Sequence, residues 1–442
     1  MLQLPSLSFD LNLGRRRSAS DVVGLDVQPG LVAAVKAHVN GSIRAERAAA
    51  QPLDADVIRE GEVVDPQALT EALRELFSGG TLGKRVRVGI ANQRTVMRTL
   101  ELPPVSDRKE LAAAVRFQAQ DQVPMPLSNA VLDFHPLGIF DSPGGPRQRV
   151  VLVAAQRDMV ERLLDAVRAA GLTPEGVDLS AFALIRSLRD RADGEDARVL
   201  YVNVDGLTNL AIAEGTTCRF TRVVGGGVEA MAADLAVRRG VALPEARALL
   251  ASIDLSIPLM PETAAAQPPA AHDSDEPHSA SEQAQTPGGQ RDGEASDADH
   301  ATDELDSTLS RDEHEAREVA MGYRETIEAA QPPAPAQEPA APAQISDADI
   351  RDVLETGVRE IAGEIRNSLD FHRTQDQGGE VAHVALSGAA LDLPGFADAL
   401  QTTLGMEVRS EAVGLVDGEL AGKVSTHRLS VAAGLATTEA PQ

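Results

Sequence analysis

The chain has 442 residues, which is enough for roughly two or three domains with buried cores. Its 41 Lys and Arg against 67 Asp and Glu give a formal charge of −26, which excludes a general nucleic-acid-binding surface. The single cysteine, Cys218, excludes a disulfide framework and fits a reducing compartment. No apolar run approaches the ~20 residues that a membrane span needs.

The first 20 residues are predicted to form a flexible leader. Its arginines, Arg15 to Arg17, follow the apolar residues, whereas a signal peptide carries its positive charge before them. Apolar and polar residues alternate here, which also suits a short strand added to a sheet edge. The apolar positions are Leu7, Phe9, Leu11 and Leu13.

A strand–turn–strand–turn–strand unit is predicted twice in the chain. The first copy has strands at 23–27, 31–39 and 42–48, with turns at 28–30 and Asn40-Gly41. The second copy has strands at 200–204, 210–213 and 218–224, with turns at Asp205-Gly206 and Glu214-Gly215. Each copy carries a polar residue and a glycine at its first turn, so two similar sheets are expected to face each other.

The region between the two copies is predicted to alternate helices and strands. Helices are expected at 65–78, 107–123 and 157–170, and strands at 85–90, 131–136, 149–155 and 176–179. Asp107 with Glu110 three residues later is a helix-start signature. The helix that they begin must end before Pro124 and Pro126, because a residue that precedes proline disfavours the helical conformation.

The stretch 258–345 differs in composition from the rest of the chain. It is rich in Ala, Pro, Glu, Asp, Ser and Gln and poor in large aliphatic residues, so a disordered acidic insertion is predicted. Its histidines have no regular ligand spacing, so no metal site is predicted. The fold is expected to resume at Ser346 with a helix over 347–369, a strand over 381–386 and a helix over 396–404.

Removal of residues 262–340 is expected to leave the cooperative thermal unfolding of the chain intact, because such a composition adds little to a buried core. Differential scanning calorimetry of the full and shortened chains measures this. Loss of a cooperative transition in the shortened chain would contradict it.

Several motifs, in the same order, resemble the PilM family, the actin-like proteins of the type IV pilus inner-membrane platform, which are related to FtsA. The motifs are Leu102 to Phe134 with its Pro124-Met125-Pro126-Leu127, Gly171-Leu172-Thr173-Pro174, Leu386-Ser387-Gly388 and Leu393-Pro394-Gly395-Phe396. The resemblance covers residues 21–257 and 346–437. It implies an α/β protein with the actin-like ATPase fold, which has duplicated ribonuclease-H-like lobes of sheet and helices and here carries an inserted strand–helix–strand–strand subdomain and the long disordered acidic insertion.

The expected domains follow from this resemblance together with the composition. They are a leader (1–20), the first part of lobe 1 (21–95), the inserted partner-binding subdomain with the return to lobe 1 (96–195), the first part of lobe 2 (196–257), the disordered insertion (258–345), the second part of lobe 2 (346–437) and a tail (438–442).

The resemblance implies a site for ATP and Mg²⁺ in which the first turns of the two copies clasp the phosphates. The residues that would form it are Asp26, Gln28, Gly30, Asn203, Gly206, Gly225, Gly226, Gly227, Ser387 and Gly388. Both turns depart from the family pattern. Gln28 replaces a glycine, Pro29 has no N–H to offer a phosphate, and Asp205 brings a negative charge where glycine is expected. Weak or absent ATP binding is therefore expected, with no catalytic residue; a purely structural role for Asp26 and Asn203 in their turns stays open.

The resemblance also implies a scaffold at the inner face of the cell membrane that binds the cytoplasmic N-terminal tail of a PilN-like membrane protein. Contacts with the pilus motor ATPase and the platform protein, and self-association, are further implications. The candidate partner-binding residues are Leu102, Leu111, Val115, Pro124, Pro126, Leu127 and Phe134. The alternatives are an FtsA-like cell-division protein, which would end in a basic amphipathic helix not seen here, and a sugar-kinase-like enzyme, which needs intact phosphate turns.

Overall fold

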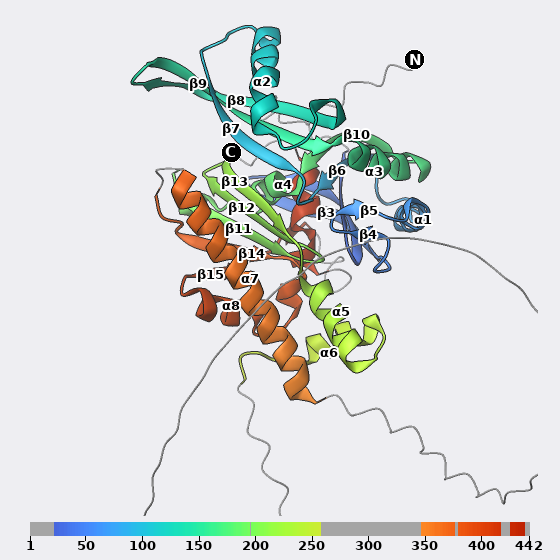
Figure 1. Ribbon diagram of the computed structural model, residues 1–442. Helices are drawn as coiled ribbons and strands as arrows, with labels where there is room; N and C mark the ends of the chain where they lie inside the picture. The colour runs from blue at the N-terminus through green and yellow to red at the C-terminus, as the bar shows by residue number, and fades with distance from the viewer. Residues whose placement is uncertain (1–21, 195, 258–345, 376–378, 417–424, 438–442) are drawn as a thin grey trace, which may run out of the picture. The chain divides into compact units, whose positions relative to one another are not determined.

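The computed structural model describes residues 22–194, 196–257, 346–375, 379–416 and 425–437 (Figure 1). The predicted leader, insertion and tail lie outside these residues. Within the described ranges, no helix combines the length and apolar character that a membrane crossing requires.

The sheet of lobe 1 is built on the first predicted three-stranded unit. β1 runs antiparallel to β2 and β2 to β3, while β6 and β10 join on the other side of β1 as parallel strands. The strand order is β10-β6-β1-β2-β3-β16. The strands are β1 (Val23–Gln28), β2 (Leu31–Val39), β3 (Ile43–Pro52), β6 (Arg85–Ile90), β10 (Thr173–Leu179) and β16 (Gly414–Leu415), with a separate pair β4 (Ile58–Arg59) and β5 (Glu62–Val63).

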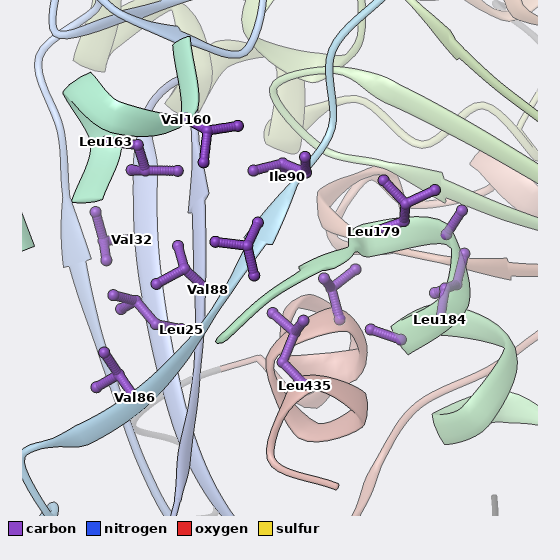
Figure 2. Close-up of a cluster of buried hydrophobic side chains, with 14 of the residues drawn as sticks. Leu25, Val32, Val86, Val88, Ile90, Val160, Leu163, Leu179, Leu184 and Leu435 are labelled. Atoms are coloured by element: carbon purple, nitrogen blue, oxygen red, sulfur yellow. The ribbon is translucent and has the colours of Figure 1, made fainter. Parts of the chain in front are cut away.

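Helices cover both faces of this sheet. They are α1 (Pro66–Leu76), α3 (Arg157–Ala169), α4 (Ser180–Leu188) and α9 (Ser430–Leu435). Figure 2 shows Val160 and Leu163 of α3 beside Val32 of the sheet, and Leu435 of α9 near Leu184 of α4. α9 lies directly on β1, because a Cβ at Gly24 would overlap the carbonyl oxygen of Ala432.

Two buried arginines hold the carboxyl end of α9. Arg87 Nη1 donates to the carbonyl of Leu435 at 2.9 Å, and Arg186 Nε donates to the carbonyl of Gly434 at 3.2 Å. Arg186 also forms a buried ion pair with Asp178. The last carbonyls of a helix lack partners within the helix, so these guanidinium groups satisfy them and fix α9 against lobe 1.

The inserted subdomain has the predicted order of strand, helix, strand, strand. These are β7 (Val96–Leu102), α2 (Arg108–Gln122), β8 (Ala130–Ser142) and β9 (Gly145–Gln156), with a single 3₁₀ turn η1 (Leu127–Asn129) before β8. Asp107 Oδ1 accepts from the backbone N–H groups of Lys109 and Glu110, both at 2.9 Å, and so begins α2 as predicted. The strand order is β7-β9-β8, so β8 has one free edge among the described strands.

The sheet of lobe 2 repeats the unit with β11 to β13 and has the order β13-β12-β11-β14-β15. Its strands are β11 (Arg198–Val204), β12 (Thr208–Glu214), β13 (Thr217–Val224), β14 (His383–Ser387) and β15 (Val408–Ser410). One face packs on α5 (Val228–Arg239), α6 (Leu243–Ser252), α7 (Asp347–Gln375) and α8 (Phe396–Leu404). α4 contacts the other face and the sheet of lobe 1 as well.

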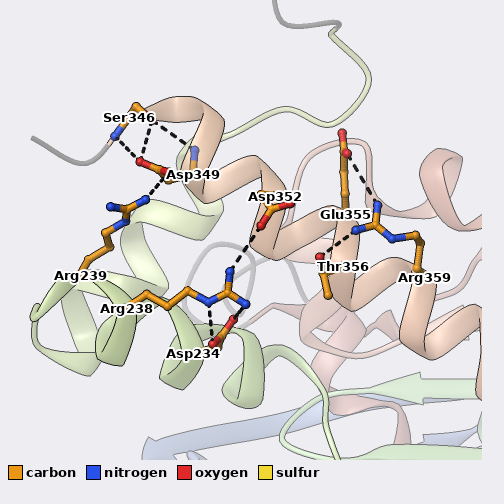
Figure 3. A network of polar contacts seen from close by, with 9 residues as sticks. All are labelled: Asp234, Arg238, Arg239, Ser346, Asp349, Asp352, Glu355, Thr356 and Arg359. Atoms are coloured by element: carbon orange, nitrogen blue, oxygen red, sulfur yellow. Dashed lines mark hydrogen bonds and ion pairs between the residues drawn. The ribbon is translucent and has the colours of Figure 1, made fainter. Parts of the chain in front are cut away.

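The helix α7 begins with the predicted capping box. Ser346 Oγ donates to Asp349 Oδ2 at 2.7 Å, and the Asp349 N–H donates to Ser346 Oγ at 3.3 Å. Figure 3 shows how α5 reaches this helix: Arg239 pairs with Asp349, and Arg238 lies 3.4 Å from Asp352. These exposed pairs contribute little energy each, and the apolar face of α7 supplies most of its attachment.

Candidate functional site

The first turn of lobe 1 begins at the end of β1, where Asp26 is buried. The Gln28 Nε2 amide donates to Asp26 Oδ2 at 2.7 Å, so this carboxyl oxygen already accepts a hydrogen bond from a side chain of the same turn. The pKa of the Asp26 carboxyl is raised to about 7, chiefly because the group is buried and in smaller part because Asp205 is near, while the Gln28 hydrogen bond and Arg428 act to lower it. Asp26 is therefore an acid largely shielded from water.

The second turn, in lobe 2, is held by side chains from distant parts of the chain. Ser387 Oγ donates to Asn203 Oδ1 at 2.9 Å, which joins the ends of β14 and β11. Arg428 Nε donates to Asp205 Oδ1 at 2.9 Å, and Asp205 is 3% exposed. Burial raises the pKa of the Asp205 carboxyl to about 6, although Arg428 acts to lower it.

The first turn of each lobe lies against the other lobe. A Cβ at Gly206 would lie 2.8 Å from Pro29 Cβ and 2.9 Å from Pro29 Cδ, so the turn of lobe 1 packs directly on the turn of lobe 2. A Cβ at Gly30, where φ is +81°, would lie 2.7 Å from Glu229 Oε1 of α5. Both first turns are thus in contact with the other lobe at the place where the resemblance puts phosphates.

The other predicted glycines also pack against this chain. Three of them have their Cβ position filled: Gly227 by the carbonyl of Asp205, Gly388 by Val204, and Gly225 by Gln93 Nε2 at 3.0 Å. Gly226 has no described atom within 4 Å of its Cβ position, but its φ of +90° itself favours glycine. Gly225 to Gly227 border a cavity of about 230 Å³ that is lined by residues of α5 and α7. Their close contacts account for glycine at these positions without a ligand.

The important contacts that sequence reasoning missed come from Arg428, Glu229, Arg247 and Gln93. Arg428 lies in the short 3₁₀ segment η5 (Thr426–Leu429) before α9, 223 positions from Asp205. Arg247 of α6 donates to Glu229 Oε2 at 2.6 Å and 3.0 Å through Nη2 and Nε. No local pattern marks these residues, because only the packing of α6 and η5 beside the turns brings them there.

The seven candidate partner-binding residues divide by burial. Leu102, Leu111 and Val115 lie in the core between α2 and its sheet, so they support the subdomain from within. Pro124 and Pro126 are exposed, and Leu127 and Phe134 are half-buried. We call the half-buried apolar residues at the junction of α2, η1 and β8 the β8 margin; they are Met125, Leu127, Leu132 and Phe134.

Comparison with known proteins decides the family. The family model described as type IV pilus assembly protein PilM matches residues 24–249, which include both first turns and the whole inserted subdomain. The chain belongs to the PilM family.

Solved structures agree with a PilM-family fold. A PilM–PilN type IV pilus biogenesis complex is 20% identical over 95% of this chain and 98% of that chain, with a TM-score of 0.64. The ethanolamine utilization protein EutJ from Carboxydothermus hydrogenoformans is 14% identical over 94% and 88%, with a TM-score of 0.44. MreB5 of Spiroplasma citri, solved with ADP, is 10% identical over 93% and 94%, with a TM-score of 0.47. The match to the PilM–PilN complex and the two repeated three-stranded units confirm the predicted fold.

The cleft residues of this PilM-family chain do not fit ATP with Mg²⁺. Pro29 offers no N–H, and its ring lies against Gly206 where a phosphate would have to pass. Asp26, the acid expected near the metal, already accepts from Gln28. Asn203, which stands where the resemblance implies an acid, accepts from Ser387 through its oxygen, and its buried Nδ2 has no hydrogen-bond partner among the residues that the structure describes.

Proposed function

We propose that this PilM-family chain is a scaffold of a type IV pilus assembly platform that binds the cytoplasmic tail of a PilN-like membrane protein. The family match over residues 24–249, which spans the inserted subdomain, is the observation that carries the proposal. The structural likeness to a PilM–PilN complex supports the choice of partner. Such a role places the chain at the inner face of the membrane through its partner and needs neither ATP nor Mg²⁺ in the cleft.

The proposed docking place is the free edge of β8. An extended tail added there would pair with unpaired backbone groups of the edge, as in strand-addition complexes. The first half of β8 suits this better than the second, because Pro136 lacks an N–H and the register shifts between Pro136 and Gly138. The β8 margin lies beside this first half and offers apolar side chains to alternate residues of the tail.

Phe134→Ala is expected to weaken binding of a synthetic tail peptide by about tenfold or more, because truncation of an aromatic anchor in a partly desolvated site removes roughly 1.4 kcal/mol or more. Fluorescence anisotropy with the full chain measures the Kd. The matched control is Phe117→Ala, since Phe117 is 70% exposed on the face of α2 opposite Leu111 and Val115. Equal affinities of the two variants would contradict docking at the β8 margin.

The same scaffold role implies contacts with the pilus motor ATPase and the platform protein, and self-association is compatible with it. None of these contacts is assigned to a surface. Co-purification of the full chain with each component, with and without the PilN-like protein, tests them separately. If the motor ATPase or the platform protein binds only when the PilN-like protein is present, then this chain contacts the PilN-like protein directly and reaches the other component only through it.

A further inference from the structure

We propose that side chains of this chain hold the cleft between the lobes closed and so exclude a nucleoside triphosphate and its metal ion. The Arg428 guanidinium is the fixed positive charge of this closed cleft. The packing, the charges and the connection of the two first turns at the lobe junction support this proposal independently of the partner tail.

The packing brings each first turn into direct contact with the other lobe. Pro29 of lobe 1 fills the Cβ position of Gly206 in lobe 2, and Glu229 of lobe 2 fills the Cβ position of Gly30 in lobe 1. These contacts are reciprocal, so each turn is covered by the other lobe. A triphosphate would enter only if both contacts were broken together.

The charges also oppose a polyphosphate. Asp26, Asp205 and Glu229 bring three carboxyl groups to the turns, and those that are ionised would repel a phosphate chain. The two arginines that contact these acids already form ion pairs with them: Arg428 pairs with Asp205, and Arg247 pairs with Glu229.

The Arg428–Asp205 ion pair connects two parts of the molecule. Arg428 precedes α9, which packs on β1, β2 and α4, whereas Asp205 directly follows β11 of lobe 2. Its guanidinium acts on both buried acids, since it lowers the pKa of Asp26 and of Asp205. A guanidinium that pairs with Asp205 and acts on Asp26 through its charge supplies the positive charge that a bound metal ion would otherwise supply.

The first test uses the wild-type full chain. Its melting temperature is expected not to change with millimolar MgATP or with Mg²⁺ alone, and isothermal titration calorimetry with MgATP is expected to show no binding heat. A ligand in large excess over its Kd raises the melting temperature of the protein that it binds. A saturable rise with MgATP would overturn the proposal, and because this test needs no variant, it does not depend on how variants fold.

The second test examines Arg428. Arg428→Gln is expected to lower the melting temperature more than the control Arg238→Gln, whose arginine pairs with Asp234 on the surface at 46% exposure. Without Arg428, Asp205 faces Asp26 and Asp392 and resists ionisation. An acid whose folded pKa is raised destabilises the fold as pH rises through that pKa, so the loss for Arg428→Gln should be larger at about pH 8 than at about pH 5. Equal losses for the two variants, or a loss that does not grow with pH, would overturn the role of Arg428.

Discussion

Gly434→Ala is expected to destabilise the chain by about 3 kcal/mol or more, since small-to-large changes at tight backbone contacts force the packed elements apart. Gly434 lies in α9 where this helix crosses α4, and a Cβ there would overlap the carbonyl oxygen of Ala183. The substitution would also disturb the carbonyl that Arg186 binds. Chemical denaturation of the two proteins measures the difference in unfolding free energy.

The matched control is Gly363→Ala in α7, where a Cβ would meet no atom within 4 Å. Alanine is the better helix former, so this variant should gain roughly 0.5–1 kcal/mol. If Gly434→Ala were as stable as wild type, α4 and α9 would not be as closely packed as the structure shows.

Asp26→Asn is expected to stabilise the chain at about pH 8 by roughly 2–4 kcal/mol, from a pKa shift of about three units at 1.36 kcal/mol each as an upper bound. The folded pKa of about 7 is above the ordinary value of 3.8, so the folded state holds a proton that the unfolded state releases between these values. Wild-type stability should therefore fall as pH rises from about 4 to 7. Asparagine stays neutral and keeps an oxygen that accepts from Gln28, so the variant should lose this fall.

Thermal unfolding of wild type and Asp26→Asn across this pH range measures the effect. Asp54→Asn is the control, because Asp54 is an exposed acid on the same lobe. If Asp26 instead served as an ionised ligand to a metal ion, its replacement would not stabilise the protein at high pH. A variant less stable than wild type at about pH 8 would contradict the account of a buried, shielded acid.

Much of the fold was predictable because short-range chemistry encodes it. The turn sequences Asn40-Gly41 and Asp205-Gly206 predict antiparallel strand pairs, and Asp107 and Ser346 predict where two helices begin. The crossing of α4 and α9 was not predicted. α9 is a six-residue helix of small residues, and its role depends on Gly24 and Gly434 meeting backbone from elements far away in sequence.

The candidate sites were predictable only in part for the same reason. The departures at Gln28, Pro29 and Asp205 were visible in the sequence, but the contacts that they make across the lobes were not. In the inserted subdomain, helical periodicity predicts that one face of the helix is apolar. It does not distinguish an apolar face that packs in the core from one that binds a partner. Leu111 and Val115 fit both readings in the sequence, and the structure places them in the core.

The proposed scaffold role predicts that the chain binds the PilN-like tail independently of nucleotide. The Kd of the full chain for a synthetic peptide of this cytoplasmic tail, determined with and without millimolar MgATP, tests it. A scaffold whose cleft is closed by its own side chains should bind the peptide with the same Kd in both conditions, because a ligand that does not bind cannot couple to the tail site. Absence of peptide binding would contradict the scaffold. A Kd that changes about tenfold with MgATP, a coupling of about 1.4 kcal/mol, would show instead that the cleft binds nucleotide and controls the partner.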